Sequence, residues 1–270
     1  MKDPQKLKVF TLHYKPGSEI ISEDPNYINI WAGKNNGSEE TVLLGDDSGD
    51  HISEKNKYYS ELTGLYWIWK NTKQDITGSC HYRRFFTAQD EPVQYKIKRN
   101  FYYLAGIWKK RYGLIYTSQP HKWKNKILSS REIEDILKDY EAIMPVRRIL
   151  RYSIKEHYAR YHDIKDLELA RNILEKDYPE YVKTFDQVMA GYRLFANNMF
   201  ILNEERFDSL MAWLFDIFSK FEDQINLKDY KNYQQRIIGF LSERLITVWI
   251  YHNNINYKEL PLIYFKKLKK

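Results

Sequence analysis

The sequence of 270 residues contains one cysteine and no long apolar run. That cysteine, Cys80, excludes a disulfide framework and any zinc site built from several cysteines. No stretch approaches the roughly 20 apolar residues that a membrane-spanning helix needs. The first residues, MKDPQKLKVF, have no apolar core of the kind that a secretory signal peptide carries. These absences favour a cytoplasmic protein.

Several familiar catalytic and nucleotide-binding motifs are also missing. The sequence has no GxGxxG, GxxxxGK[ST], HExxH, GxSxG or CxxC pattern. Their absence argues against a dinucleotide-binding fingerprint, a P-loop nucleotidase, a zincin protease, a serine hydrolase of the nucleophile-elbow type and a CxxC redox protein.

Acidic residues are absent from residues 92–131, whereas the whole chain carries a net charge of +7. That segment holds ten of the 43 basic residues, so the remaining chain has 33 basic against 36 acidic residues. It is also rich in Tyr, Trp and Phe. Basic and aromatic residues together suit single-stranded nucleic acid, and they equally suit the headgroup layer of an anionic membrane. The pattern leaves both partners open.

Apolar residues make up 43% of the chain, enough for the core of one domain. Period-2 patterns and short apolar runs predict strands, and apolar spacings of three and four residues predict helices. The predicted strands are 7–14, 27–31, 41–44, 75–80, 140–145, 197–203 and LPLIYF near the end. The predicted helices are 58–71, one opened by the capping box Ser129/Glu132, about 153–161, 164–176, 204–223 and about 230–251. This alternation predicts a single α/β domain over 1–270, with a mostly parallel sheet flanked by helices and a helix-rich C-terminal half.

The block GSCHYRRFF, residues 78–86, places His81, Tyr82, Arg83 and Arg84 at the carboxyl end of a predicted strand. Ligands bind at that end of the strands in open α/β sheets. Arginine matches phosphate or carboxylate through a planar fork of donors, and the neighbouring His and Tyr can hydrogen-bond the same anion. The alternative is that both arginines pair with the acidic loop 46–50, and the pattern does not decide between the two.

Other polar residues also follow predicted strands or begin helices. Asp46, Asp47 and Asp50 lie in the turn GDDSGD, where carboxylates can hold a divalent cation or act as a general base. Asp and Gly are common in surface turns without any such role, and the pattern alone favours that interpretation. Glu61 begins a helix, where the dipole favours a carboxylate with or without a ligand. Glu243 and Arg244 are interpreted as a structural ion pair.

Four blocks of the chain, taken in order, resemble a known family. They are ISEKNKYYSELTGLYWIWKN, ITGSCHYRRFF, ANNMFILNEERFDSLMAWLF and YQQRIIGFLSERL. They resemble the domain of unknown function 4422 family, whose members lie in bacterial capsule, exopolysaccharide and O-antigen clusters and are regarded as glycosyltransferases. The resemblance covers most of the chain. Residues 92–131 do not match it and are interpreted as a basic aromatic insertion.

The resemblance implies a GT-A-like domain that binds a UDP-sugar. In many such enzymes a strand ends in Asp-x-Asp, whose metal neutralises the donor diphosphate. Here the corresponding strand ends in His81-Tyr82-Arg83-Arg84, which implies that cations replace the metal and that Mn²⁺ or Mg²⁺ is not required. The donor-binding residues implied are His13, Lys15, Glu61, Thr63, Tyr82, Arg83, Arg84, Asn197, Asn198 and Arg236.

The resemblance implies catalytic roles as well. Asp46, Asp47 or Asp50 would supply the general base for an inverting reaction, and His81 would assist at the diphosphate or sugar. The expected activity is transfer of a hexose, such as galactopyranose or galactofuranose, to a glycan or lipid-linked glycan acceptor in surface polysaccharide synthesis. The expected location is cytoplasmic, peripheral at the inner membrane face, with no nucleic acid partner.

Two hypotheses of other classes compete with this one. The first is a non-catalytic module that binds nucleic acid or another anionic polymer through residues 92–131. The second is a scaffold that has the glycosyltransferase fold, has lost catalysis and organises polysaccharide assembly. Binding of UDP and release of UDP from a UDP-sugar separate all three.

Overall fold

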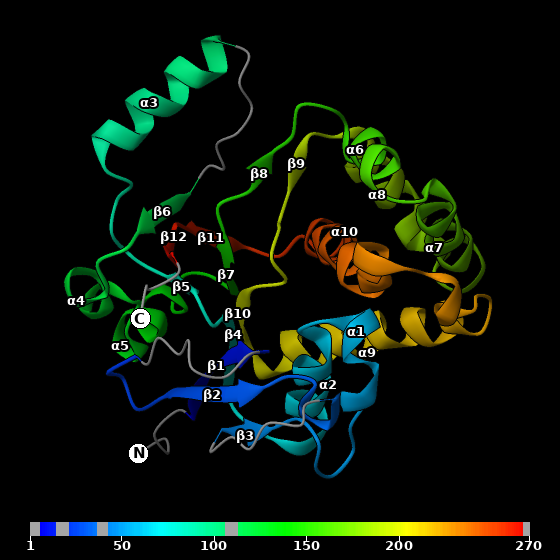
Figure 1. Ribbon diagram of the computed structural model, residues 1–270, viewed down its shortest axis with the longest axis horizontal. Coiled ribbons are helices and arrows are strands. Elements are labelled where there is room, and N and C mark those ends of the chain that lie inside the picture. The colour runs from blue at the N-terminus through cyan, green and yellow to red at the C-terminus, as the bar shows by residue number, and fades with distance from the viewer. Residues whose placement is uncertain (1–5, 15–21, 37–42, 106–112, 267–270) are drawn as a thin grey trace.

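The computed structural model describes residues 6–14, 22–36, 43–105 and 113–266, and Figure 1 shows their arrangement. The centre of the molecule is a ten-stranded sheet, whose main path runs β11-β7-β10-β4-β1-β2-β3. These strands are Tyr257–Leu260, Ala142–Pro145, Phe200–Asn203, Ile76–His81, Leu7–His13, Tyr27–Trp31 and Leu44–Gly45. β10 is antiparallel to both neighbours, and the other pairings along this path are parallel. The expectation of a mostly parallel α/β sheet is therefore confirmed.

Three further strands extend the sheet sideways from β4. β5 (Arg84–Phe86) forms a hairpin with β4 and pairs antiparallel with β12 (Leu262–Phe265). β12 in turn pairs parallel with β6 (Leu114–Thr117). A separate two-stranded ribbon joins β8 (Arg148–Ile149) to β9 (Arg193–Leu194).

Helices cover both faces of this sheet and enclose two cores. The larger core lies between one sheet face and helices of the C-terminal half together with α1 and α2. The smaller core lies on the other face and includes β5, β12 and α5. The helices of the larger core are α1 (Asn56–Tyr59), α2 (Leu62–Asn71), α6 (Ile154–Tyr161), α7 (Ile164–Asp177), α8 (Pro179–Ala190), α9 (Glu204–Glu222) and α10 (Ile237–His252). The helix-rich C-terminal half is visible in Figure 1, in the green to orange ribbons.

One predicted helix is interrupted in a way that matters for the site. The sequence predicts one helix over 58–71, but Ser60 has a positive φ of 55°, which ends α1 and lets α2 begin at Leu62. The side chain of Asn56 donates a hydrogen bond to the Ser60 carbonyl, 2.7 Å away, and holds this turn. The break gives α2 its own amino terminus beside the carboxyl ends of β4 and β1.

The basic segment 92–131 has two structurally different parts. Its first part forms α3 (Val93–Leu104), which stands away from the rest of the chain in Figure 1. Its second part contains β6, the short α4 (Pro120–Trp123) and the buried residues Ile127 and Leu128. The capping box predicted at Ser129 and Glu132 is confirmed at the start of α5 (Ser130–Ile136). That the segment is an insertion relative to the family that the chain resembles stays a prediction. No described helix is long and apolar enough to cross a membrane.

Candidate active site

The HYRR block forms the tight turn between β4 and β5. His81 pairs directly with Arg84 across this hairpin, and Tyr82 and Arg83 occupy the turn. Directly opposed side chains on antiparallel strands lie on the same face, and the Arg84 Nη1 is 3.5 Å from the His81 Nδ1. The Arg83 guanidinium instead stacks 4.7 Å from the centre of the Tyr82 ring. The hairpin therefore separates the two arginines, and only Arg84 accompanies His81.

His81 is held as a neutral imidazole with a defined tautomer. Its Nε2 is 2.5 Å from the backbone carbonyl oxygen of Asn197. Because a carbonyl only accepts, Nε2 carries the proton and the Nδ1 lone pair faces Arg84. Burial lowers the pKa of His81, the Glu61 carboxylate opposes that shift, and the Arg84 charge adds to it.

Glu61 lies at the centre of the charged groups. It is the residue before α2, and its side chain is only 12% exposed. One carboxylate oxygen accepts a hydrogen bond from the Asn198 Nδ2 at 2.8 Å and lies 3.7 Å from the His81 Nε2. The other lies 3.6 Å from the Arg236 Nη2. We call Glu61, His81, Arg84, Asn198 and Arg236 the carboxyl-edge cluster.

The cluster presents two cations in different environments. The Arg236 side chain is 49% exposed, and its Nε donates to the Ser60 hydroxyl at 2.8 Å. The Arg84 Nε is buried and has no hydrogen-bond partner among the described residues. A buried unsatisfied donor is costly unless a ligand or water meets it. The arrangement thus offers one anchored cation at the solvent side and one buried donor at the strand end.

A pair of left-handed asparagines supports the cluster from the start of β10. Asn197 and Asn198 have φ values of 82° and 51°, a region that Asn tolerates better than most residues. The Asn197 amide donates to the Glu243 carboxylate at 2.7 Å. The Asn198 carboxamide oxygen accepts from the Ser242 hydroxyl at 2.9 Å. The sequence predicted both asparagines as donor-binding residues but not their left-handed turn. The Asn-Asn dipeptide is the feature of the sequence that indicates such a turn.

Glu243 and Arg244 form the buried ion pair that the sequence suggested. The Arg244 Nη1 lies 3.1 Å from the Glu243 carboxylate and donates to the Phe240 carbonyl at 2.8 Å. Through Glu243 this pair fixes the Asn197 amide, so its role is to position the asparagine turn.

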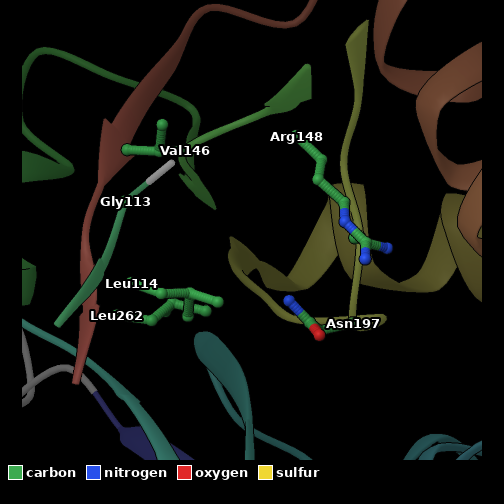
Figure 2. Close-up of a pocket in the computed structure, with 7 residues that line it drawn as sticks. Gly113, Leu114, Val146, Arg148, Asn197 and Leu262 are labelled. Carbon is green, nitrogen blue, oxygen red and sulfur yellow. The ribbon is translucent and has the colours of Figure 1, made fainter. Parts of the chain in front are cut away.

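A shallow pocket adjoins the cluster on the other side of Asn197. Figure 2 shows the Arg148 and Asn197 side chains on one wall and Leu114, Leu262 and Val146 on the other. Asn197 therefore lines this pocket with its side chain, while its carbonyl accepts the hydrogen bond from His81. The pocket encloses only about 20 Å³, so a ring with hydroxyl groups and apolar C–H faces could lie across its polar and apolar walls at the mouth but not inside it.

The acidic turn 45–50 lies apart from the cluster. Asp46 is fully buried and accepts hydrogen bonds from the Gly33 amide at 2.8 Å and the Ser53 hydroxyl at 2.5 Å. These hydrogen bonds hold the chain after β2, and the expectation that Asp46 acts as a base stays a prediction.

The other two aspartates are no closer to the cluster. Asp47 pairs with Lys34 at 3.6 Å and follows β3, which is three strands from β4; at about 4.8 Å per strand that separation is about 14 Å. Asp50 accepts from the Tyr66 hydroxyl at 3.0 Å, and its amide donates to Asn71 at the far end of α2. Neither is within hydrogen-bond reach of the cluster, and the role of either as a general base towards an acceptor hydroxyl stays a prediction.

The remaining expected donor-binding residues are dispersed. Thr63 is buried and bonds with Ser60 and Asn56 in the turn before α2, so we assign it a structural role. The His13 Nε2 is 3.0 Å from the Asn29 carboxamide oxygen. The Tyr82 hydroxyl is 2.9 Å from that of Tyr14, which with burial raises the pKa of Tyr82 to about 12. Lys15 lies outside the described residues.

Comparison with known proteins places the chain in a family. The family model described as Domain of unknown function (DUF4422) matches residues 8–254, so the chain belongs to that family. The fold also resembles the apo structure of WbbM, titled a bifunctional glycosyltransferase, with a TM-score of 0.82 and 26% sequence identity. The match covers 97% of this chain and 46% of the WbbM chain, so this chain spans less than half of that protein's length. No curated protein matches the sequence.

Proposed function

We propose that this chain is a glycosyltransferase that moves a hexose from a UDP-sugar to a glycan acceptor. Family membership and the likeness to a bifunctional glycosyltransferase support the reaction class. The observation that carries the proposal is the pairing of His81 with Arg84 at the carboxyl end of β4, the edge where open α/β sheets bind ligands. The architecture we propose is of the GT-A type.

The donor diphosphate is proposed to bind at the carboxyl-edge cluster. Arg84 would meet one phosphate with its buried, unpartnered Nε, and the half-exposed Arg236 would meet the diphosphate from the solvent side. Fixed positive charge placed where a leaving group gains negative charge is a strong form of transition-state stabilisation. We propose that these guanidinium groups take the place of a divalent metal. No group of three metal-ligating side chains occurs within the described ranges.

Neutral His81 is proposed to orient Arg84 through its Nδ1 lone pair. Glu61 is proposed to accept hydrogen bonds from hydroxyls of the transferred sugar, since its carboxylate lies within 4 Å of both His81 and Arg236. The acceptor ring is proposed to lie across the mouth of the pocket beyond Asn197. The acceptor is proposed to be a lipid-linked glycan of surface polysaccharide synthesis, which would place the enzyme at the inner membrane face.

The experiment is a calorimetric titration with UDP. Arg84→Ala should weaken UDP binding by about 10- to 100-fold, because hydrogen bonds to charged groups contribute about 1.5–3 kcal/mol. Arg83→Ala is the matched control, since its guanidinium stacks on Tyr82 in the turn, and it should change affinity less than threefold.

Thermal unfolding of each variant checks that the hairpin is intact. An equal loss of UDP affinity in Arg83→Ala and Arg84→Ala would contradict the proposed geometry. Absence of UDP binding by the wild-type chain, with binding of single-stranded DNA instead, would favour a nucleic-acid module.

A further inference from the structure

The helix α3 carries an apolar face that is largely exposed to solvent. Val93, Ile97, Phe101 and Leu104 are 67%, 65%, 69% and 84% exposed. Their spacing of four, four and three residues places them along one side of a helix. Contiguous exposed apolar surface marks a site of interaction with a partner or a membrane.

The charge of the surrounding segment selects the partner. The helix contains three basic and no acidic residues, and the whole segment 92–131 contains ten basic and no acidic residues. A second copy of α3 would bring like charges together, which opposes self-association through this face. An anionic lipid surface offers negative headgroups for the basic residues and an apolar layer for the apolar face of α3.

We propose that α3 is an interfacial helix that inserts its apolar face into an anionic membrane. The inference deepens the proposed function and rests on it for the identity of the acceptor. Gly113, which lines the candidate acceptor pocket, lies nine residues after Leu104. Nine residues span at most about 30 Å. A helix lying in the membrane surface would hold the pocket within that distance of a lipid-linked substrate.

The test is flotation of the full chain with phosphatidylcholine vesicles, with and without phosphatidylglycerol. The wild-type chain should bind the anionic vesicles strongly and the neutral ones weakly, through the apolar face alone. Ile97→Glu should weaken binding by at least about tenfold, since burial of an isoleucine side chain is worth about 1.5–3 kcal/mol. The matched control is Leu44→Glu, at an exposed leucine of β3 outside the segment, which should bind as the wild type does.

Salt separates insertion from attraction by charge alone. Insertion predicts that part of the binding survives high salt in the wild type and is lost in Ile97→Glu. Complete loss of wild-type vesicle binding at high salt would overturn the proposal, and so would equal vesicle binding by Ile97→Glu and Leu44→Glu. So would wild-type dimerisation that Ile97→Glu abolishes. UDP titration of the same variants should be unchanged, so failure here is distinguishable from failure of the donor site.

Discussion

Replacement of Glu61 by glutamine tests the electrostatics of the carboxyl-edge cluster. The Glu61 carboxylate lies 3.6 Å from Arg236. At an effective dielectric constant of about 20, two unit charges at that distance attract each other by about 5 kcal/mol. The Arg236 side chain is 49% exposed, so solvent screening reduces this to about 1 kcal/mol. A diphosphate bound to the same cations would be repelled by Glu61 to a similar extent.

Glu61→Gln should therefore tighten binding of UDP while it slows transfer from a UDP-hexose. We expect about fivefold higher affinity for UDP, from about 1 kcal/mol of repulsion removed. Turnover, measured as UDP released, should fall by about 10-fold or more, because a charged acceptor of a sugar hydroxyl is lost. The glutamine oxygen can still accept from Asn198, so the fold should be retained.

Glu141→Gln is the matched control for this prediction. Glu141 pairs with Arg206 at 2.6 Å just before β7, away from the site, and its replacement should leave both measurements unchanged. Weaker UDP binding by Glu61→Gln, at an unchanged melting temperature, would refute the idea that this carboxylate repels the bound diphosphate.

Two further predictions concern stability. Asn198→Ala should lower the free energy of unfolding by about 2 kcal/mol in chemical denaturation, because buried hydrogen bonds to Glu61 and Ser242 are lost. Asn198→Gly should lower it less, since glycine relieves the positive φ. Equal destabilisation by the two variants would argue against backbone strain at this position. The pKa of His157 is lowered to about 4 by burial and by Arg244. Between about pH 6.5 and 4 the unfolded chain then binds more protons than the folded chain, so stability falls as pH falls through that window. The full pKa shift corresponds to a loss of about 3 kcal/mol in the free energy of unfolding. Because His157 is partly exposed, we expect a loss of about 1–2 kcal/mol. His157→Gln should flatten the dependence, and an unchanged slope would assign it to other groups.

The elements that carry strong local patterns were predictable from the sequence. The helix 204–223 is observed as α9, Glu204–Glu222, because its apolar stripe follows the helical period. The strand before HYRR was also expected, and β4 ends at His81. That the two arginines diverge was not predictable, because it depends on the two-residue turn that pairs His81 with Arg84.

The acidic turn shows why the surroundings of other candidate residues were not predictable from the sequence. The sequence pattern favours a surface turn for Asp46, yet this residue is buried and its partners include the amide of Gly33, thirteen residues earlier. No local pattern reveals such a partner. The apolar stripe of α3 was likewise hidden, since Tyr and Lys residues interrupt its period in the sequence.

The most direct test of the account is UDP affinity of the wild-type chain measured in EDTA and again with added Mn²⁺. If Arg84 and Arg236 neutralise the negative charge of the diphosphate, the dissociation constant of UDP should be the same within about twofold under both conditions. Binding that appears only with Mn²⁺ and disappears in EDTA would contradict the proposal that guanidinium groups take the place of the metal.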